Sequence, residues 1–283
     1  MERTEPDLLS LGAERQNLGP CLTVRNGRRR TTARFLPGVD ESGVPLVALH
    51  GISRNAKAIW STFQPLAAGQ GRALLVPLLD RKNWPNFQRI DAYRPDLALL
   101  DLLRRAELAQ SKIELFGFSG GAQLAHRFAM LYPHKVARLH VAAPGWFCLP
   151  RTDVVWPEGL GDAEQGPGRL RRSVLGEPYR IQLPTYLSLP VRVWVGANDT
   201  ERDPALRKSA QLDHLEGTNR LERATRYVKE FRQAAEKLQI KPDIELSVLP
   251  GSGHDFSECA RIGGLAERVI NQPPNHGECR DHR

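Results

Sequence analysis

A serine within a glycine-rich turn is the strongest indication of chemistry in this sequence. Ser119 lies in the segment Gly117-Phe118-Ser119-Gly120-Gly121, between an apolar run at 113–118 and a stretch of helical periodicity at 120–131. A G-x-S-x-G pattern between a strand and a helix is typical of a nucleophilic serine held at a sharp turn, where side chains at 117 and 121 would collide with neighbouring elements. The alternative is an ordinary glycine-rich turn whose serine only caps the helix.

A histidine and an aspartate stand where such a serine needs its partners. A serine hydroxyl is a poor nucleophile at neutral pH, so it needs a base that is itself held by an acid. In this setting the acid follows a later strand and the histidine follows the last strand. The run VRVWVGAND at 191–199 ends in Asp199, and the run IELSVLPGSGHDF at 244–256 contains His254. We therefore predict that Ser119 is the nucleophile, His254 the base and Asp199 the acid.

Other residues compete for two of these roles. Asp199 could instead cap the helix expected near Pro204, and Asp203 is a rival acid one turn later in the chain. Asp255, next to His254, is better suited to capping the helix that follows it. The remaining histidines lie in other loops, inside predicted helices or strands, or in polar segments, at positions 50, 126, 134, 140, 214, 276 and 282.

The negative charge that develops on a substrate oxygen needs hydrogen-bond donors. One donor is expected to be the backbone N–H of Gly120, directly after the serine, and the second comes from the loop after the run VPLVAL at 44–49. In that loop Ile52 N–H is the predicted donor, with Gly51 N–H as the reserve. Gly51 lets the backbone approach a substrate closely, and His50 is expected to brace the loop through hydrogen bonds.

Candidate substrate contacts lie just after the predicted strand ends. They are Arg54, Trp84, Phe87, Trp146 and Phe147. Arg54 could bind a carboxylate or phosphate of the substrate, or it could pair with a surface acid. The aromatic side chains favour an acyl or aryl group over a highly charged substrate.

Short apolar runs that alternate with helical periods must position these residues. Such alternation indicates an α/β fold with a mostly parallel sheet covered by helices on both faces, and it places functional residues at the carboxyl ends of the strands. The predicted strands are a hairpin at 20–36 with its turn at Asn26-Gly27, followed by runs at 44–49, 73–79, 113–118, 136–143, 191–195 and 244–249. The predicted helices are 95–108, 120–131, 221–238 and about 256–270.

One domain accounts for most of the chain. We expect an N-terminal arm at 1–19, the α/β domain at 20–271 and a flexible C-terminal tail at 272–283. An insertion at about 146–189 reads as neither strand nor regular helix, and connections of that length are usually functional. Because it combines glycines with aromatic residues, we expect a lid over an apolar pocket. The alternative is that its aromatics pack on the core, at positions 146, 147, 156, 179 and 186.

The composition describes a soluble globular protein and excludes several other classes. Of 283 residues, 41% are hydrophobic, and 40 basic against 32 acidic residues give a net charge of +8. That charge is not by itself a nucleic-acid pattern, and the basic runs lack interleaved aromatics, so we expect no nucleic-acid partner. The four cysteines, at positions 21, 148, 259 and 279, have neither CxxC nor zinc spacing.

No cofactor, metal or membrane span is expected. The sequence lacks HExxH, a P-loop and a GxGxxG before a helix. No stretch approaches the roughly 20 apolar residues that a membrane helix needs, and residues 1–19 lack the basic and apolar regions of a signal peptide. We therefore expect a cytoplasmic protein, whereas the sequence does not indicate its oligomeric state.

Four segments together resemble the α/β-hydrolase superfamily, and they occur in its order over residues 44–270. They are LHGIS at 49–53, GFSGG at 117–121, GAND at 196–199 and GSGHD at 251–255. The segment HGISRNAKAIW at 50–60 is similar to the HGxxxNAxxW-type loop of polyhydroxybutyrate-depolymerase-like and feruloyl-esterase-like members. The resemblance implies an eight-stranded, mostly parallel sheet with one antiparallel strand near the start. It also implies acyl transfer through a covalent acyl-serine.

The sequence therefore predicts a serine hydrolase that cleaves a small-molecule carboxylic ester by Ser-His-Asp chemistry. A peptidase or amidase on the same fold would use the same three residues on another substrate. A non-catalytic binding protein of this fold normally lacks one of the three, and none is missing here. The motifs do not specify the acyl or alcohol part of the substrate.

Overall fold

A computed structural model of the protein describes most of the chain, namely residues 19–39, 43–90, 93–161 and 170–272. The N-terminal arm expected at 1–19 and the tail expected at 272–283 lie outside these residues, apart from Gly19 and Gln272. The middle of the expected insertion, at 162–169, also lies outside them.

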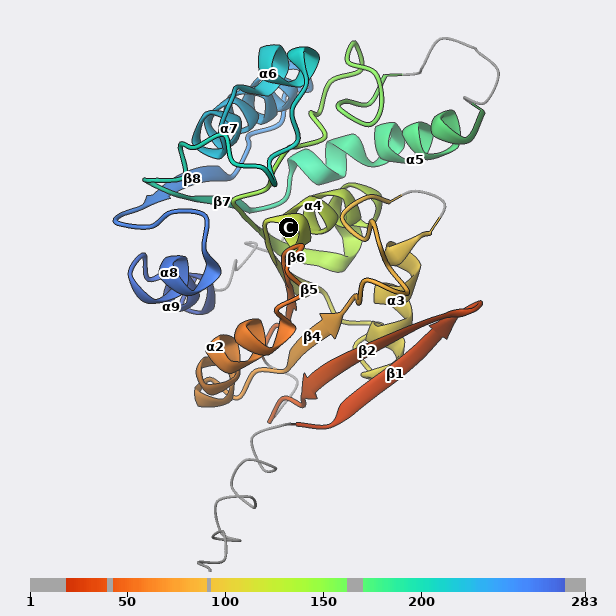
Figure 1. The fold of residues 1–283 in the computed structure, drawn as a ribbon. Coiled ribbons are helices and arrows are strands. Elements are labelled where there is room, and N and C mark those ends of the chain that lie inside the picture. Colours follow the sequence, from red (N-terminus) through yellow and green to blue (C-terminus); the bar gives the residue numbers. More distant parts are fainter. Residues whose placement is uncertain (1–18, 40–42, 91–92, 162–169, 273–283) are drawn as a thin grey trace, which may run out of the picture.

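A single sheet crosses the domain (Figure 1). Within the described ranges its eight strands are β1 (Cys21–Asn26), β2 (Arg29–Leu36), β3 (Leu46–Leu49), β4 (Leu74–Leu78), β5 (Ile113–Phe118), β6 (Val136–Ala142), β7 (Val191–Gly196) and β8 (Ile244–Leu249). Their order in the sheet is β1-β2-β4-β3-β5-β6-β7-β8. β2 runs antiparallel to both neighbours and the other pairs are parallel. The prediction of a mostly parallel sheet with one antiparallel strand near the start is confirmed.

Helices cover both faces of the sheet (Figure 1). They are α2 (Ala56–Gly69), α3 (Pro95–Arg105), α4 (Gly120–Leu131), α5 (Leu170–Leu187), α6 (Ala210–Glu216), α7 (Arg220–Lys237), α8 (Phe256–Arg261) and α9 (Leu265–Ile270), with a 3₁₀ turn η1 (Pro133–Lys135). Side chains of α3, α4, α5 and α7 form the core on one face, and those of α2, α8 and α9 form the core on the other. None of these helices, as far as the chain is described, is long and apolar enough to span a membrane.

The central strands serve both cores because alternate side chains point to opposite faces. In β3, Val47 and Leu49 join the core under α4, whereas Leu46 and Ala48 join the core under α2. A strand that is buried on both faces has no polar side, which explains the continuous apolar runs in the sequence.

Helix α2 has no counterpart among the predicted elements. Asn55 caps it by accepting a backbone N–H at 3.2 Å, and the buried side chains of Ile59, Trp60 and Phe63 pack in the second core. Pro65 lies inside the helix. A proline in a helix interior removes one N–H donor, so the sequence at this position does not indicate a helix. The burial of the apolar face of α2 therefore stabilises this helix more than Pro65 destabilises it.

The C-terminal helix is two helices rather than one. The sequence predicts a single helix over about 256–270, but α8 ends at Arg261 and α9 begins at Leu265. Gly264, the N-cap of α9, has φ +65°, a left-handed conformation that glycine adopts readily and that a continuous right-handed helix cannot contain. The prediction of one continuous helix is wrong for this reason.

The expected insertion contains a helix and buries its aromatic residues. The sequence predicts neither strand nor regular helix at 146–189, but α5 occupies its C-terminal part and packs on α4 and α7 (Figure 1). Two prolines inside α5, Pro178 and Pro184, explain why its periodicity is hard to recognise. The described part shows packing on the core, the alternative to a lid, for Trp146, Phe147, Trp156, Tyr179 and Tyr186.

The core position of α5 predicts the effect of two substitutions. Tyr186 is fully buried and its ring packs edge-on against Phe231 of α7. Tyr186→Ala should lower the free energy of unfolding by about 3–5 kcal/mol, because it removes a buried aromatic ring. Ile181 on the same helix is 66% exposed, so Ile181→Ala should change it by less than about 0.5 kcal/mol. Urea denaturation measures both variants, and similar losses in the two would contradict this packing.

Candidate active site

Ser119 stands at a sharp turn between β5 and α4. Its backbone has φ +53° and ψ −114°, a strained conformation of the kind that costs about 1–3 kcal/mol and clusters at functional sites. Ser119 N–H donates to Ala142 O of β6 at 2.8 Å, and Gln123 N–H donates to Ser119 O at 3.2 Å. The neighbouring strand and the first turn of α4 thus hold the serine in place from two sides.

Two glycines make this turn possible. A Cβ on Gly117 would lie 2.3 Å from Gly121 O, and a Cβ on Gly121 would lie 2.4 Å from Leu49 O at the end of β3. Both distances are far inside van der Waals contact, so a side chain at either position would push β3, β5 and α4 apart. This is the collision that the glycine spacing in the sequence predicts.

The three residues predicted from separate segments lie in one hydrogen-bonded line. His254 Nε2 is 3.0 Å from Ser119 Oγ, and His254 Nδ1 is 2.8 Å from Asp199 Oδ2. Because a carboxylate only accepts, we assign the ring proton to Nδ1, which leaves Nε2 free to accept the serine O–H. Asp199 is 3% exposed and Ser119 8%, whereas the side chain of His254 is 21% exposed. The line is therefore shielded at the acid and open to solvent at the histidine.

Close contact between two loops aligns the acid with the histidine. Asn198 N–H, next to Asp199, donates to Ser252 O at 2.9 Å. A Cβ on Gly196 would lie 2.3 Å from Ser252 O, so the end of β7 can approach the loop after β8 only because residue 196 is glycine. The carboxyl ends of two neighbouring parallel strands thereby bring Asp199 and His254 to the same edge of the sheet.

The two competing acids have other partners. Asp203 Oδ1 accepts two backbone N–H groups of the turn that follows it, at 2.6 and 3.0 Å, and its Oδ2 pairs with Arg220. Although burial acts in the opposite direction, the hydrogen bond and charge of Arg220 lower the pKa of Asp203. Asp255 caps α8, as predicted, by accepting Glu258 N–H at 2.9 Å.

Arg220 also belongs to this group of side chains, and it is not among the residues that the sequence predicts. It is the first residue of α7, and its Nη1 donates to Asp199 Oδ1 at 3.2 Å and also pairs with Asp203. Arg220 is 1% exposed. No motif identifies it, because it lies 21 positions after Asp199 and on a different element.

The loop after β3 lies against the serine turn. A Cβ on Gly120 would lie 3.3 Å from Ile52 N and 2.8 Å from Ile52 Cγ2, and a Cβ on Gly51 would lie 3.3 Å from Ser119 Cβ. The backbone nitrogens of Ile52 and Gly120 therefore occupy neighbouring positions beside the serine. A pair of donors to a developing oxyanion needs such an arrangement.

His50 braces this loop. Its Nδ1 donates to Gly51 O at 2.9 Å, and its Nε2 accepts Leu79 N–H at 3.0 Å, so the ring connects the loop to the end of β4. The pattern requires a neutral imidazole, since a protonated ring could not accept from Leu79. Burial lowers the pKa of His50 to about 4, and the ring is therefore neutral at neutral pH.

A hollow of about 200 Å³ opens beside Ser119 and His254. The ring of Phe118 stacks on the imidazole of His254, with 5.4 Å between centroids and 23° between planes. Among the described residues that line the hollow, Asp255 is the one acidic residue, and there is no lysine or arginine. Besides Ser119 and His254, the lining consists of Gly51, Ile52, Ser53, Asn55, Ile59, Phe118, Ala205, Asp255, Phe256 and Ser257.

The predicted substrate contacts are not among the described residues that line this hollow. Arg54 instead donates to the carbonyls of Trp84 and Pro85, at 2.9 and 3.1 Å, and stacks on Phe87. The sequence places these residues after strand ends, but the direction of a side chain there depends on loop geometry that no motif encodes. The four aromatics are buried in the fold, at Trp84, Phe87, Trp146 and Phe147.

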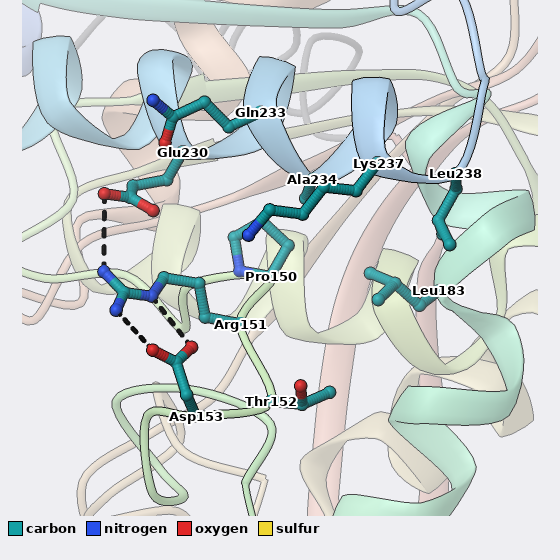
Figure 2. A pocket seen from close by; sticks show the side chains of 10 residues that line it. All are labelled: Pro150, Arg151, Thr152, Asp153, Leu183, Glu230, Gln233, Ala234, Lys237 and Leu238. Atoms are coloured by element: carbon teal, nitrogen blue, oxygen red, sulfur yellow. Dashed lines mark hydrogen bonds and ion pairs between the residues drawn. The ribbon is translucent and has the colours of Figure 1, made fainter.

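A second hollow, of about 170 Å³, is lined by none of Ser119, Asp199 and His254 and lies between α5, α7 and the segment after β6 (Figure 2). Figure 2 shows Arg151 between Asp153 and Glu230, with N–O distances of 2.6 and 3.5 Å. Acidic partners thus match the charge of Arg151 within the hollow. In the part of the chain that the structure describes, no three His, Cys, Asp or Glu side chains gather as metal ligands.

Solved structures with the same arrangement of elements identify the fold. Poly(aspartic acid) hydrolase-1 from Sphingomonas sp. KT-1 matches with a TM-score of 0.71 at 19% identity, over 89% of this chain and 96% of that one. A poly(3-hydroxybutyrate) depolymerase from Bordetella parapertussis matches with a TM-score of 0.68 at 24% identity, over 87% and 84%. This chain has the α/β-hydrolase fold.

A third α/β-hydrolase-fold match is more distant. Est1E from Butyrivibrio proteoclasticus has a TM-score of 0.53 at 16% identity, over 88% of this chain and 96% of that one. No protein-family model and no curated protein matches the chain in sequence. The likeness therefore lies in the arrangement of strands and helices, and the activity must be argued from the site itself.

The pKa of His50 predicts how the stability of this α/β-hydrolase fold depends on pH. Between about pH 4 and the ordinary value of 6.5, the unfolded chain binds a proton at this ring and the folded chain does not. The free energy of unfolding should therefore fall as the pH drops through that window, by up to about 3 kcal/mol from His50 alone. His126 and His140, whose pKa values burial also lowers, act in the same direction.

The contribution of His50 is isolated by comparison with His50→Gln, because an amide does not titrate. Urea denaturation at about pH 7 and about pH 4.5 should show a smaller acid-induced loss in the variant than in the wild type. Glu216, whose pKa burial raises to about 8, acts in the opposite direction, but it is present in both proteins and cancels. An equal loss in the two proteins would contradict a buried, neutral His50.

Proposed function

We propose that this chain is a serine hydrolase that cleaves a carboxylic ester through an acyl-enzyme. The observation that carries the proposal is the line from Asp199 Oδ2 through His254 to Ser119 Oγ, with contacts of 2.8 and 3.0 Å. The α/β-hydrolase fold supports it, because the structural neighbours of this chain include a hydrolase and a depolymerase.

Acylation begins when Ser119 Oγ attacks the ester carbonyl carbon. His254 Nε2 takes the hydroxyl proton as the new C–O bond forms, and the carbonyl π electrons move onto the oxygen. Asp199 accepts from Nδ1 throughout, which fixes the ring tautomer and stabilises the imidazolium. When the tetrahedral species collapses, the bond to the alcohol oxygen breaks and His254 Nε2 returns its proton to the leaving alcohol.

The N–H groups of Gly120 and Ile52 are the proposed donors to the negatively charged oxygen, with Gly51 N–H as the alternative. Gly120 is the first residue of α4, so the dipole of that helix also favours negative charge at this point. One such donor contributes about 3 kcal/mol to lowering the barrier in comparable enzymes.

Water completes the cycle. His254 removes a proton from water as the water oxygen attacks the acyl-serine carbonyl, and the imidazolium then protonates Ser119 Oγ as the carboxylic acid leaves. The partial exposure of the His254 side chain gives water access to Nε2. The same three residues thus serve both halves of the reaction.

The hollow at Ser119 favours a small, neutral group beside the scissile bond. Its volume of about 200 Å³ is below the roughly 300–1,000 Å³ of pockets that enclose drug-sized ligands. Asp255 would repel a substrate carboxylate, and no described lysine or arginine lines the hollow to compensate. The proposal therefore favours a neutral ester, such as poly(3-hydroxybutyrate) contains, over a polyanion such as poly(aspartic acid).

Labelling with a fluorophosphonate, which reacts with activated serines, tests the nucleophile. The wild type should be labelled and should hydrolyse p-nitrophenyl acetate. Ser119→Ala and His254→Ala should lose labelling, and hydrolysis should fall about 10⁴-fold or more. Ser61→Ala, an exposed serine on α2, is the matched control and should behave as the wild type. A folded wild type that takes up no label would contradict the proposal.

Matched substrates test the bond and the charge. The neutral p-nitrophenyl butyrate should be cleaved faster than the p-nitroanilide of the same acid, and faster than the p-nitrophenyl monoester of succinic acid. The first comparison separates an esterase from an amidase or peptidase, because faster cleavage of the anilide would favour the latter. The second depends on Asp255, and Asp255→Asn should reduce the discrimination against the succinate ester.

A further inference from the structure

The carboxylate of Asp199 has two oxygens, and His254 uses only one of them. Oδ2 accepts from His254 Nδ1, whereas Oδ1 accepts from Arg220 Nη1 at 3.2 Å. Asp199 is buried, so Oδ1 has little contact with water and needs a donor from the protein. Arg220 supplies that donor from α7, an element that contains none of Ser119, Asp199 and His254.

Arg220 is itself held between two carboxylates. Its Nη1 also pairs with Oδ2 of Asp203, which follows Asp199 in the same loop. A buried guanidinium is tolerated only when it is paired and hydrogen-bonded, and Asp203 provides the second partner. Two carboxylates and one guanidinium leave one net negative charge, which can stabilise one imidazolium at His254.

The start of α7 also contacts Asp199 through its backbone. Leu221 N–H donates to Asp199 O at 3.3 Å, and Asn219 caps the helix by accepting a backbone N–H at 3.0 Å. Arg220 lies between these two residues. The side-chain contact and the backbone contact together tie the loop that carries the acid to one helix end.

We propose that Arg220 is a positioning residue for the hydrolase: it fixes the Asp199 carboxylate so that Oδ2 faces His254, and with Asp203 it sets how strongly that carboxylate stabilises the imidazolium. The inference rests on the proposed function. The positive charge of Arg220 opposes protonation of His254, and the negative charge of Asp203 favours it. Removal of the Arg220 charge should therefore make His254 easier to protonate, and removal of the Asp203 charge should make it harder to protonate.

Other titratable groups face this cluster from neighbouring elements. They are Arg223 on α7, Asp255 in the loop before α8, and Glu258 and Cys259 on α8. Burial, with the charge of Asp199 as a further cause, raises the pKa of Cys259 to about 12, so this thiol is neutral over the working range. All four groups are unchanged in the variants of Arg220 and Asp203, so a shift in those variants reports on the two altered charges.

The test is the pH dependence of kcat/KM for ester hydrolysis, whose acid limb reports the pKa of the base in the free enzyme. Arg220→Met removes a positive charge, so the limb should move to higher pH. kcat should also fall about tenfold or more, because the carboxylate loses the partner that orients it. Asp203→Asn removes a negative charge, so the limb should move to lower pH, while its amide oxygen still accepts from the turn.

Two further variants separate positioning from general damage. Arg220→Lys keeps the charge with fewer donors, and its acid limb should stay close to that of the wild type. Arg223→Met removes another buried arginine from the same helix, one that pairs with Asp213 and not with Asp199. It should lower the thermal stability and move the midpoint of the acid limb less than Arg220→Met does, because Arg223 makes no contact with Asp199.

Each outcome decides the matter. Opposite shifts in Arg220→Met and Asp203→Asn support the proposal, whereas no shift, or shifts in one direction, overturns it. If Arg220→Met does not fold, the other two variants carry the test. The proposal is then supported if the acid limb of Asp203→Asn moves to lower pH while that of Arg220→Lys stays at the wild-type position. An unmoved acid limb in Asp203→Asn overturns the proposal. A wild type that takes up no fluorophosphonate rejects the hydrolase function itself, whereas a labelled wild type with unmoved limbs in the variants rejects only the role of Arg220.

Discussion

The strained backbone at Ser119 is the constraint on which the rest of the site depends. A residue with a side chain stays at φ +53° only when its surroundings leave no alternative. Here β5, α4 and the end of β3 close on the turn through two positions, 117 and 121, where only glycine fits. The same turn presents the hydroxyl at the carboxyl edge of the sheet and sets the first N–H of α4 beside it. A relaxed turn would move both the Ser119 hydroxyl and this N–H away from the edge of the sheet.

Buried charges around Asp199 must be matched, and this requirement ties the candidate site to more distant elements. An unpaired ion in the interior is strongly destabilising, so buried Asp199 needs Arg220, and buried Arg220 needs Asp203 as well. His50 meets the same requirement in another way, because it stays neutral and uses both ring nitrogens to connect the loop after β3 to the end of β4. Arg220 and His50 thus hold Asp199 and the loop after β3 in place.

Local patterns in the sequence were sufficient to predict the sheet and the hydrogen-bonded line at its edge. The glycines around Ser119 and the strand-end position of Asp199 are set within a few residues of chain, and strands buried on both faces read directly as apolar runs. Contacts between distant elements were not predictable in this way. Arg220 reaches the acid from the start of a later helix, and Phe256 reaches the hollow from α8. The sequence does not predict helix α5, because two prolines lie inside it and its helical conformation depends on packing.

If Ser119 is the nucleophile, a substrate acyl group becomes covalently bound to it during turnover. Acid-quench mass spectrometry can detect this species in enzyme sampled during the initial release of p-nitrophenol from excess p-nitrophenyl acetate. We expect the chain to gain the mass of one acetyl group, which maps to the peptide containing Ser119 and disappears as the substrate is exhausted. An acetyl group on a different residue, or hydrolysis during which Ser119 stays unmodified, would show that Ser119 is not the nucleophile.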